Sequence, residues 1–135
     1  MKQLILLALL LACGTAQAAK WVSLYSDASG AKTAADASSI RIDGDIRRAS
    51  VKVLYAPQTQ HGVGKNSLKW VRYNLSRDAF DCSKGAHRNE ALRTYFTDGT
   101  SDQIAANPVP TPWEPVAPDS VGGLVMKFVC GWKPK

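Results

Sequence analysis

Cysteine is the residue type in this chain whose spacing points most directly to chemistry. The 135 residues include three cysteines, Cys13, Cys82 and Cys130. Cys13 lies in a segment that we expect to be removed or lipidated during export, so Cys82 has only Cys130 to pair with. In an oxidising compartment such a pair forms a disulfide. The two positions are 48 residues apart and lack the C-x-x-C spacing of redox-active pairs, so we predict a structural bond.

The N-terminus has the pattern of a secretory signal peptide. Lys2 precedes an apolar run over residues 4–12, and residues 16–18, Ala-Gln-Ala, supply the small-residue cleavage site. We predict a signal peptide over residues 1–18 and one domain over residues 19–135, exported to the periplasm or the outer cell surface. A lipoprotein site that ends at Cys13, and leaves a lipid anchor there, is the alternative. The apolar run is well short of the roughly 20 residues of a membrane span, so no transmembrane segment is expected.

Other side chains with catalytic or metal-binding chemistry form no recognisable set. His61 and His87 are 26 positions apart and lack a second ligand at helical or C-x-x-C spacing, which disfavours a metal or haem site. No G-x-S-x-G motif is present, and most aspartates stand beside Gly, Ser or Ala, where they cap turns. A glycosidase-type carboxylate pair stays open, because the sequence does not show separation in space. We predict no catalytic residue, no metal, no cofactor and no enzymatic activity.

Basic residues outnumber acidic ones in the predicted domain. Without Lys2, 16 Lys and Arg face 11 Asp and Glu, a net charge of +5, so the surface should attract anions. The candidate partner-binding site is the polar face of a central strand, with Trp70, Arg72 and Asn74, joined by Lys52 or Arg48 from a neighbouring strand. An exposed aromatic ring among cations suits a protein partner or an acidic glycan. The alternative is an ordinary solvated face on which a loop or helix covers Trp70. Nucleic acid is not expected, because the charge is dispersed and its recognition motifs are absent.

The elements that must position these side chains are mainly strands. Apolar residues alternate with polar ones, which predicts strands over residues 20–25, 40–42, 46–56, 68–75, 90–97 and 100–105. Asp43-Gly44 predicts a type I′ hairpin turn, and Asp98-Gly99 predicts a second hairpin. A change of apolar parity after residues 76–78 indicates a bulge. Residues 58–67 read as an exposed loop, and the Pro-rich run 107–115 reads as an ordered crossing loop.

One helix is predicted near the C-terminus. An apolar stripe recurs at helical spacing through Val121, Leu124, Val125, Phe128 and Val129. Pro118 and Asp119 suit the first turn, and Gly131 can supply a left-handed stop. The Gly122-Gly123 pair indicates a close approach to the sheet or a start later than Pro118. The predicted fold class is α+β, a single antiparallel β-sheet of about six strands with one C-terminal α-helix packed on it, stapled by the disulfide.

A series of short motifs spans nearly the whole predicted domain. In order, they are Asp36-Ala37-Ser38-Ser39-Ile40, Asp81-Cys82-Ser83, Tyr95 with Asp98-Gly99, Trp113, Pro118-Asp119-Ser120-Val121 and Cys130. In this order and spacing they resemble the bacterial surface-adhesin protein E domain family. The resemblance implies an exported domain with an antiparallel sheet, a packed C-terminal helix and a disulfide. It also implies an adhesin that binds host extracellular-matrix proteins.

Two non-enzymatic functions follow as expectations. In the first, the chain is a cell-surface or envelope adhesin-like domain that binds extracellular-matrix or envelope proteins, as the resemblance implies. In the second, it is a periplasmic accessory protein that docks on another envelope protein and has no adhesive role. A mature N-terminus at Ala19, soluble in the periplasm, favours the second function, whereas a lipidated Cys13 or exposure on the cell surface favours the first.

Overall fold

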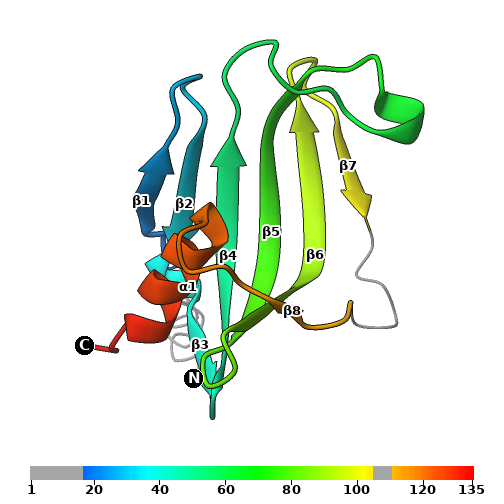
Figure 1. Ribbon diagram of the computed structural model, residues 1–135. Helices are drawn as coiled ribbons and strands as arrows, with labels where there is room; N and C mark the ends of the chain where they lie inside the picture. Colours follow the sequence, from blue (N-terminus) through cyan, green and yellow to red (C-terminus); the bar gives the residue numbers. More distant parts are fainter. Residues whose placement is uncertain (1–16, 105–110) are drawn as a thin grey trace, which may run out of the picture.

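Six strands follow one another across a single antiparallel sheet, in the order β1-β2-β4-β5-β6-β7, and one helix packs on it (Figure 1). The computed structural model describes residues 17–104 and 111–135. The elements are β1 (Trp21–Ser26), β2 (Lys32–Asp36), β3 (Arg41–Asp43), β4 (Ile46–Leu54), β5 (Val71–Asp81), β6 (Ala86–Phe96), β7 (Ser101–Ile104), β8 (Glu114–Pro115) and α1 (Val121–Gly131), with 3-10 turns at Ala37–Ser39 and Gly64–Asn66. Short β3 pairs with β4, and β8 pairs with β6. The predicted fold class is confirmed.

Some predictions fall on residues that are not described. Most of the predicted signal peptide, including Cys13 and the first residue of the Ala-Gln-Ala site, lies outside the described residues, and so do residues 107–110 of the Pro-rich run. Within the described ranges, no helix has the length and apolarity needed to cross a membrane.

The alternation of apolar and polar residues did not predict β2, which lies between β1 and β4. Its segment, Lys-Thr-Ala-Ala-Asp, lacks the large β-branched and aromatic residues that mark strands. Thr33 and Ala35 face α1 and are buried, so this position calls for small side chains. Packing against the helix therefore requires small side chains in β2, and small side chains do not produce the apolar alternation by which strands are predicted.

Both predicted hairpins form, but the first uses a different turn from the one expected. Asp43 pairs with Ile46, so Gly44 and Asp45 are the central residues. Of these, only Gly44 has a positive φ, 58°. A type I′ turn needs positive φ at both central positions, so the type I′ prediction is wrong and the turn has the glycine-first pattern of type II′. The second hairpin has a three-residue loop that ends at Gly99, with φ 85°.

Two bulges set which side chains of β5 face which way. Against β6, the register shifts between Val71 and Tyr73, which leaves Arg72 as the extra residue, and again between Arg77 and Asp78, where Glu90 of β6 is extra. The second shift lies where a bulge was expected, although β5 itself stays in register with β4 from Tyr73 to Asp81. Strand β5 begins at Val71, so Leu68, which was predicted inside it, lies in the loop and is 92% exposed.

Helix α1 starts at Val121, the first residue of its apolar stripe, which confirms the start later than Pro118 that the Gly122-Gly123 pair indicated as one of two possibilities. Ser120 is the N-cap, and its hydroxyl accepts a hydrogen bond of 3.0 Å from the backbone N–H of Gly123. Pro118 and Asp119 therefore precede the helix. The close approach predicted at the Gly122-Gly123 pair is made by Gly123, to the carbonyl oxygens of the preceding loop and not to the sheet. Gly131 ends the helix without a positive φ, so the expected left-handed stop is wrong.

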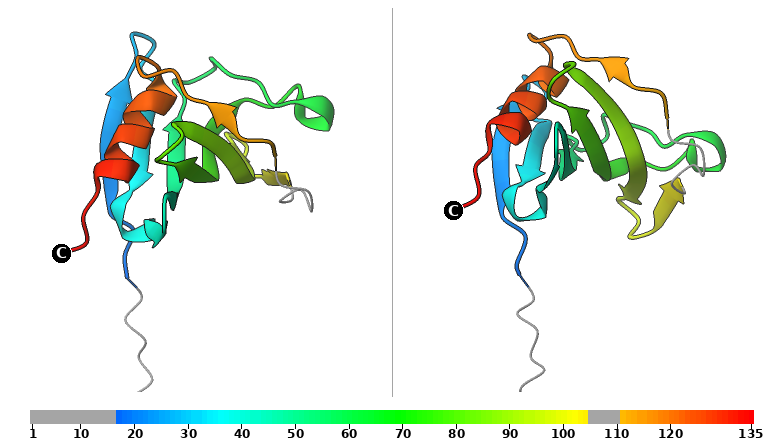
Figure 2. Two further views of the ribbon diagram at one scale, coloured as in Figure 1. Left: turned by 60° about the horizontal axis from the view of Figure 1, so that its bottom comes forward. Right: turned by 90° about the horizontal axis from the view of Figure 1, so that it is seen from below.

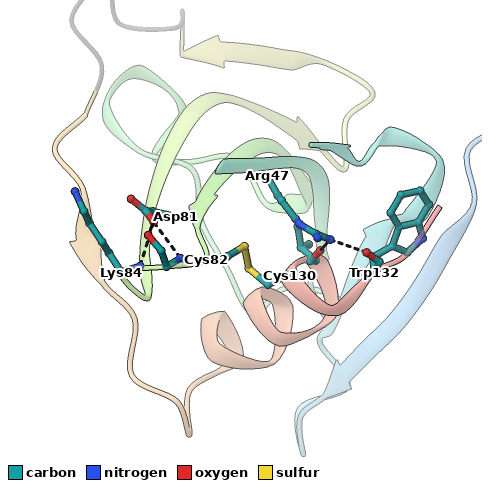
Figure 3. Close-up of a disulfide and its surroundings, with 8 residues drawn as sticks. Arg47, Asp81, Cys82, Lys84, Cys130 and Trp132 are labelled. Atoms are coloured by element: carbon teal, nitrogen blue, oxygen red, sulfur yellow. Dashed lines mark hydrogen bonds between the residues drawn. A yellow bond between two sulfur atoms is a disulfide. The ribbon is translucent and has the colours of Figure 1, made fainter. Parts of the chain in front are cut away.

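The core lies between α1 and the sheet. Phe80 and Val129 are its largest fully buried side chains, whereas Leu124 of the predicted stripe is 41% exposed. A disulfide joins Cys82, just after β5, to Cys130 in the last turn of α1, with the two Cα atoms 5.8 Å apart (Figure 3). Arg47 of β4 fastens the same helix end, since its guanidinium donates to the carbonyl oxygens of Val129 (3.0 Å) and Trp132 (2.6 Å). The predicted disulfide is confirmed.

Candidate functional site

The two faces of the sheet are covered differently. On one, the helix face, α1 packs against β1, β2, β4 and β5, and the loop of residues 60–66 lies beside it over β5, β6 and β7. Neither covers the opposite face, here called the open face. Paired residues on adjacent strands point to the same side of a sheet, so the register places Lys52, Leu54, Tyr73, Leu75, Arg77, Arg93 and Tyr95 on the open face. Figure 2 shows how strongly the sheet curves between its two edges.

The structure does not bring the predicted partner-binding residues together. Lys52 pairs with Leu75 and lies on the open face, whereas Asn74 pairs with Val53 and lies on the helix face. Arg72 is exposed at the first bulge, near the end of the sheet. Trp70 precedes β5 and stacks on His61, with ring centroids 3.7 Å apart. The expectation that these four side chains share one face is wrong, because the register of β4 with β5 places Asn74 opposite Val53, and the bulge at Arg72 changes the alternation of β5 before it.

Asn74 belongs to a polar part of the helix face. Its side-chain amide donates to the hydroxyl of Tyr55 at 3.2 Å, while its own oxygen is buried without a hydrogen-bond partner among the described residues. Together with Val71 and Phe96, it lines a cavity of about 130 Å³ beneath the 60–66 loop. This position makes Asn74 part of the packing between the loop and the sheet.

Aromatic rings and a lysine cross the open face. The rings of Tyr73 and Tyr95 stack with centroids 4.3 Å apart. The Lys52 ammonium lies 4.6 Å from the ring centroid of Trp21 and 5.1 Å from that of Tyr73. Cations at these distances are attracted to the ring faces. These four side chains come from β1, β4, β5 and β6, so no short sequence motif contains them.

Positive charge dominates this face. Cross-strand pairing places seven basic side chains on it: Lys32, Arg41, Arg48, Lys52, Arg77, Arg88 and Arg93. Five of them, Lys32, Arg41, Lys52, Arg77 and Arg93, form no ion pair within the part of the chain that the structure describes. Arg41 donates instead to the carbonyl oxygens of Ser38 and Ile40. Acidic groups on this face are already engaged, since Asp43 and Glu90 pair with Arg48 while Asp36 and Asp81 accept hydrogen bonds within turns.

One end of the open face carries a compact ionic cluster. The guanidinium Nε of Arg48 donates to both carboxylate oxygens of Glu90 at 3.1 Å, and Arg88 reaches the same carboxylate at 3.3 Å. Trp113, just before β8, lies with its ring centroid 4.6 Å from the Arg88 guanidinium carbon. Glu90 occupies the second bulge, so the bulge turns its carboxylate toward both arginines. Glu90 and Asp43, whose carboxylate lies 3.9 Å from Arg48, together balance the charges of the two arginines, and the cluster fixes the edge of the face.

Four aspartates of the chain stabilise turns. Asp27, Asp36, Asp81 and Asp98 each accept hydrogen bonds from both the backbone N–H and the hydroxyl of a Ser or Thr two positions later. The Thr100 hydroxyl and N–H lower the pKa of Asp98 from 3.8 to about 2. The Ser29 hydroxyl likewise lowers the pKa of Asp27. These carboxylates stay ionised as turn caps, in agreement with the turn positions predicted for them.

The two histidines lie in different parts of the helix face. His61 belongs to the loop that stacks on Trp70, whereas His87 of β6 lies with its Nε2 3.6 Å from the Asp78 carboxylate and its ring beside Phe80. Both histidines therefore have structural neighbours.

The predicted site did not include Trp21, Tyr73, Tyr95 or Arg93. Tyr73 and Leu75 alternate with Arg72 and Asn74, so in a regular strand they share an apolar face with Val71 and are expected in the core. Lys52 and Arg93 each stand at a polar position of their own alternating strand, but the sequence does not show which strands are neighbours. Without β2 and the strand register, nothing in the sequence could place these cations beside the tyrosines.

Comparison with known proteins gives one match. The family profile described as Surface-adhesin protein E matches residues 21–131, which covers every strand and the helix. Neither the curated proteins nor the solved structures gave a match.

Proposed function

The chain belongs to the surface-adhesin protein E family, and from this membership we propose that it is an exported, non-catalytic binding domain of the cell surface or envelope. We propose that its partner is a component of the extracellular matrix or of the bacterial envelope, with proteins as the first class to test. The observation that carries the proposal is the open face, where stacked tyrosines lie among Lys32, Lys52, Arg77 and Arg93, cations that form no ion pair with any described residue. Aromatic and arginine side chains are the types that contribute most to protein interfaces.

The polar groups support binding in preference to catalysis. Four aspartates cap turns, and both described cysteines are joined in the disulfide. The carboxylate of Glu90 accepts hydrogen bonds from two arginines at 3.1 and 3.3 Å, so its oxygens are engaged within the protein. A binding face needs only accessible charge and ring surface, and the open face offers both.

Location tests the adhesin proposal first. We would label intact cells with a membrane-impermeant amine reagent and then fractionate them. Labelling of the chain on intact cells is the expected result. Labelling only after the outer membrane is disrupted would contradict surface adhesion and favour the periplasmic accessory role, in which the same face docks on an envelope protein.

Binding tests the assignment of the face. The chain of residues 19–135 should be retained on surfaces coated with extracellular-matrix proteins or with outer-membrane fragments. The double variant Lys52→Glu/Arg93→Glu reverses two charges of the open face, and it should lose this retention. Lys127→Glu/Lys133→Glu makes the same charge change at exposed positions in α1 and after it, and it should retain binding. Equal retention of both variants would remove the open face from the proposal.

A further inference from the structure

The chemistry of the open face narrows the class of partner. One cross-strand row contains Lys32, Leu54, Tyr73 and Tyr95, and the next contains Lys52, Leu75 and Arg93. Each row crosses three or four strands, and the spacing of about 4.8 Å between strands gives the longer row a span of about 14 Å. Lys32 therefore stands at one end of the row that contains the tyrosines, and Lys52 and Arg93 stand in the row beside it. A partner that fits this pattern alternates negative groups with flat apolar surface over the same distance.

The backbone under these rows is not available to a peptide. Strand β4 is paired on both sides by β2 and β5, and β5 is paired on both sides by β4 and β6. An extended peptide that adds a strand uses a free sheet edge, so this common mode of peptide recognition is closed here. What the face offers is side-chain charge and ring surface, without backbone donors or acceptors.

Sugar chains with acidic groups have the complementary chemistry. The C–H face of a pyranose ring packs on an aromatic ring, and a carboxylate or sulfate makes charge-assisted hydrogen bonds with Lys and Arg. Tyr73 and Tyr95 stack on each other and Lys52 lies over the ring of Tyr73, so the surface that the pair provides is its ring edges and the face of Tyr95 turned away from Tyr73. Arg93 lies in the next cross-strand row. Arg93 is exposed and donates to the neutral Gln103 side chain at 2.6 Å, so its charge is not neutralised within the described residues.

We propose that the open face binds an anionic polysaccharide that carries carboxylate or sulfate groups, with Lys52 and Arg93 on the anions and Tyr73 and Tyr95 beneath the sugar rings. The inference rests on the proposed function, because it names the ligand class of the same face. It places recognition on the glycan part of a matrix or envelope component.

The test uses defined probes and the disulfide-bonded chain of residues 19–135. Calorimetric titration with heparin, polygalacturonate and neutral dextran should show binding to one or both of the acidic chains and none to dextran. Affinity should fall steeply as salt is raised from 0.05 to about 0.5 M, because exposed charges are screened over a few ångströms at high salt. If the protein binds dextran with the same affinity as heparin or polygalacturonate, the proposed role of the cations is overturned.

Two variants separate the roles of charge and rings. Lys52→Glu/Arg93→Glu should weaken binding at least about tenfold, since each lost charge-assisted bond corresponds to about tenfold or more in affinity. Tyr73→Leu/Tyr95→Leu keeps all charges and should also weaken binding at least about fivefold. Lys127→Glu/Lys133→Glu is the charge-matched control and should stay within about twofold of the wild-type chain. Each variant is first checked for a cooperative thermal transition, and the single variant Tyr95→Leu replaces the tyrosine double variant if that one fails to fold.

The outcomes distinguish this inference from the function on which it rests. If poly-glutamate binds as tightly as the acidic polysaccharides and the tyrosine variant binds normally, the face recognises charge alone and the glycan proposal is overturned. If matrix proteins or envelope fragments bind through Lys52 and Arg93 while both acidic polysaccharides fail, the proposed function stands and the glycan inference falls. If no partner of any class senses these substitutions, both fall.

Discussion

Removing the disulfide is the perturbation whose cost the structure allows to be worked out most directly. The bond between Cys82 and Cys130 closes a loop with a sequence separation of 48 residues. In the chain-entropy model, opening a loop of this length lowers the free energy of unfolding by about 4 kcal/mol at 25 °C. Both cysteines pack against the hydrophobic core, so alanine is the replacement that introduces no buried hydroxyl. Cys82→Ala/Cys130→Ala should therefore lose about 4 kcal/mol.

Urea unfolding measures this loss. A domain of this size is stable by about 5–15 kcal/mol, so the variant should fold but sit near the lower end of that range. With a slope of about 1–3 kcal/mol per M, the midpoint should fall by about 1.3–4 M. The wild-type chain unfolded in the presence of a reducing agent is the matched control, and it should behave like the variant. The slope itself should rise, because the unfolded chain without its crosslink exposes more surface.

A loss below about 1 kcal/mol would refute this reasoning. It would mean that the unfolded chain stays compact without the bond. The two hydrogen bonds from Arg47 to the C-terminal end of α1 are present in both forms, so they cannot account for a small difference.

Three further predictions concern single side chains. Gly123→Ala should lower the free energy of unfolding in urea by more than about 1 kcal/mol, because a Cβ there would collide with carbonyl oxygens of the preceding loop. Gly122→Ala is the control, since its Cβ meets only ordinary contacts, and it should stabilise the chain by about 0.5–1 kcal/mol. Equal effects of the two substitutions would contradict the close approach at Gly123. Asp98→Ala should destabilise at pH 7. The pKa of the Asp98 carboxylate is lowered from 3.8 to about 2 in the folded chain, so its contribution to the free energy of unfolding is complete above pH 4 and fades as the pH falls toward 2. A difference in stability between wild type and variant that persists at pH 2 would argue against this cause. Arg47→Met should cost about 2–3 kcal/mol by thermal or urea unfolding, because two helix carbonyl oxygens lose a charged donor, and an unchanged midpoint would show that the helix end is held by other contacts.

The overall architecture could be predicted because its signals are local. The alternation of apolar residues in β1, β4 and β6 is set by neighbours within each strand, and the helix stripe is set by residues three and four apart. The disulfide followed from counting cysteines in an exported chain. Each of these inferences needs no knowledge of how strands pair.

The candidate site could not be predicted in the same way, because it depends on register. A single extra residue at Arg72 reverses the alternation at the start of β5, so Val71 turns to the helix face and Tyr73 to the open face. The polar Asn74 then points inward, toward Tyr55, while the apolar Leu75 points outward, beside Lys52. A prediction from sequence assumes that polar side chains face solvent and apolar ones face the core, and Asn74 and Leu75 have the opposite orientations.

The residues that carry the family resemblance separate into two groups in the structure. The first group sets the fold: three aspartates cap turns, Ser120 caps α1, and the two cysteines form the disulfide. The second group is Tyr95 and Trp113, which lie on the open face, stacked on Tyr73 and placed over Arg88.

The cations around those rings, Lys52 and Arg93 among them, are not part of the resemblance. If the family motif specifies the rings and leaves the charges free, the aromatic surface is a family property and the sign of the charge around it is a property of each member. A relative with Tyr95 and Trp113 in place but with neutral or acidic residues at the positions of Lys52 and Arg93 would keep the ring surface and reject acidic partners. The ligand of this chain is then to be sought from its own cations and not from the family name.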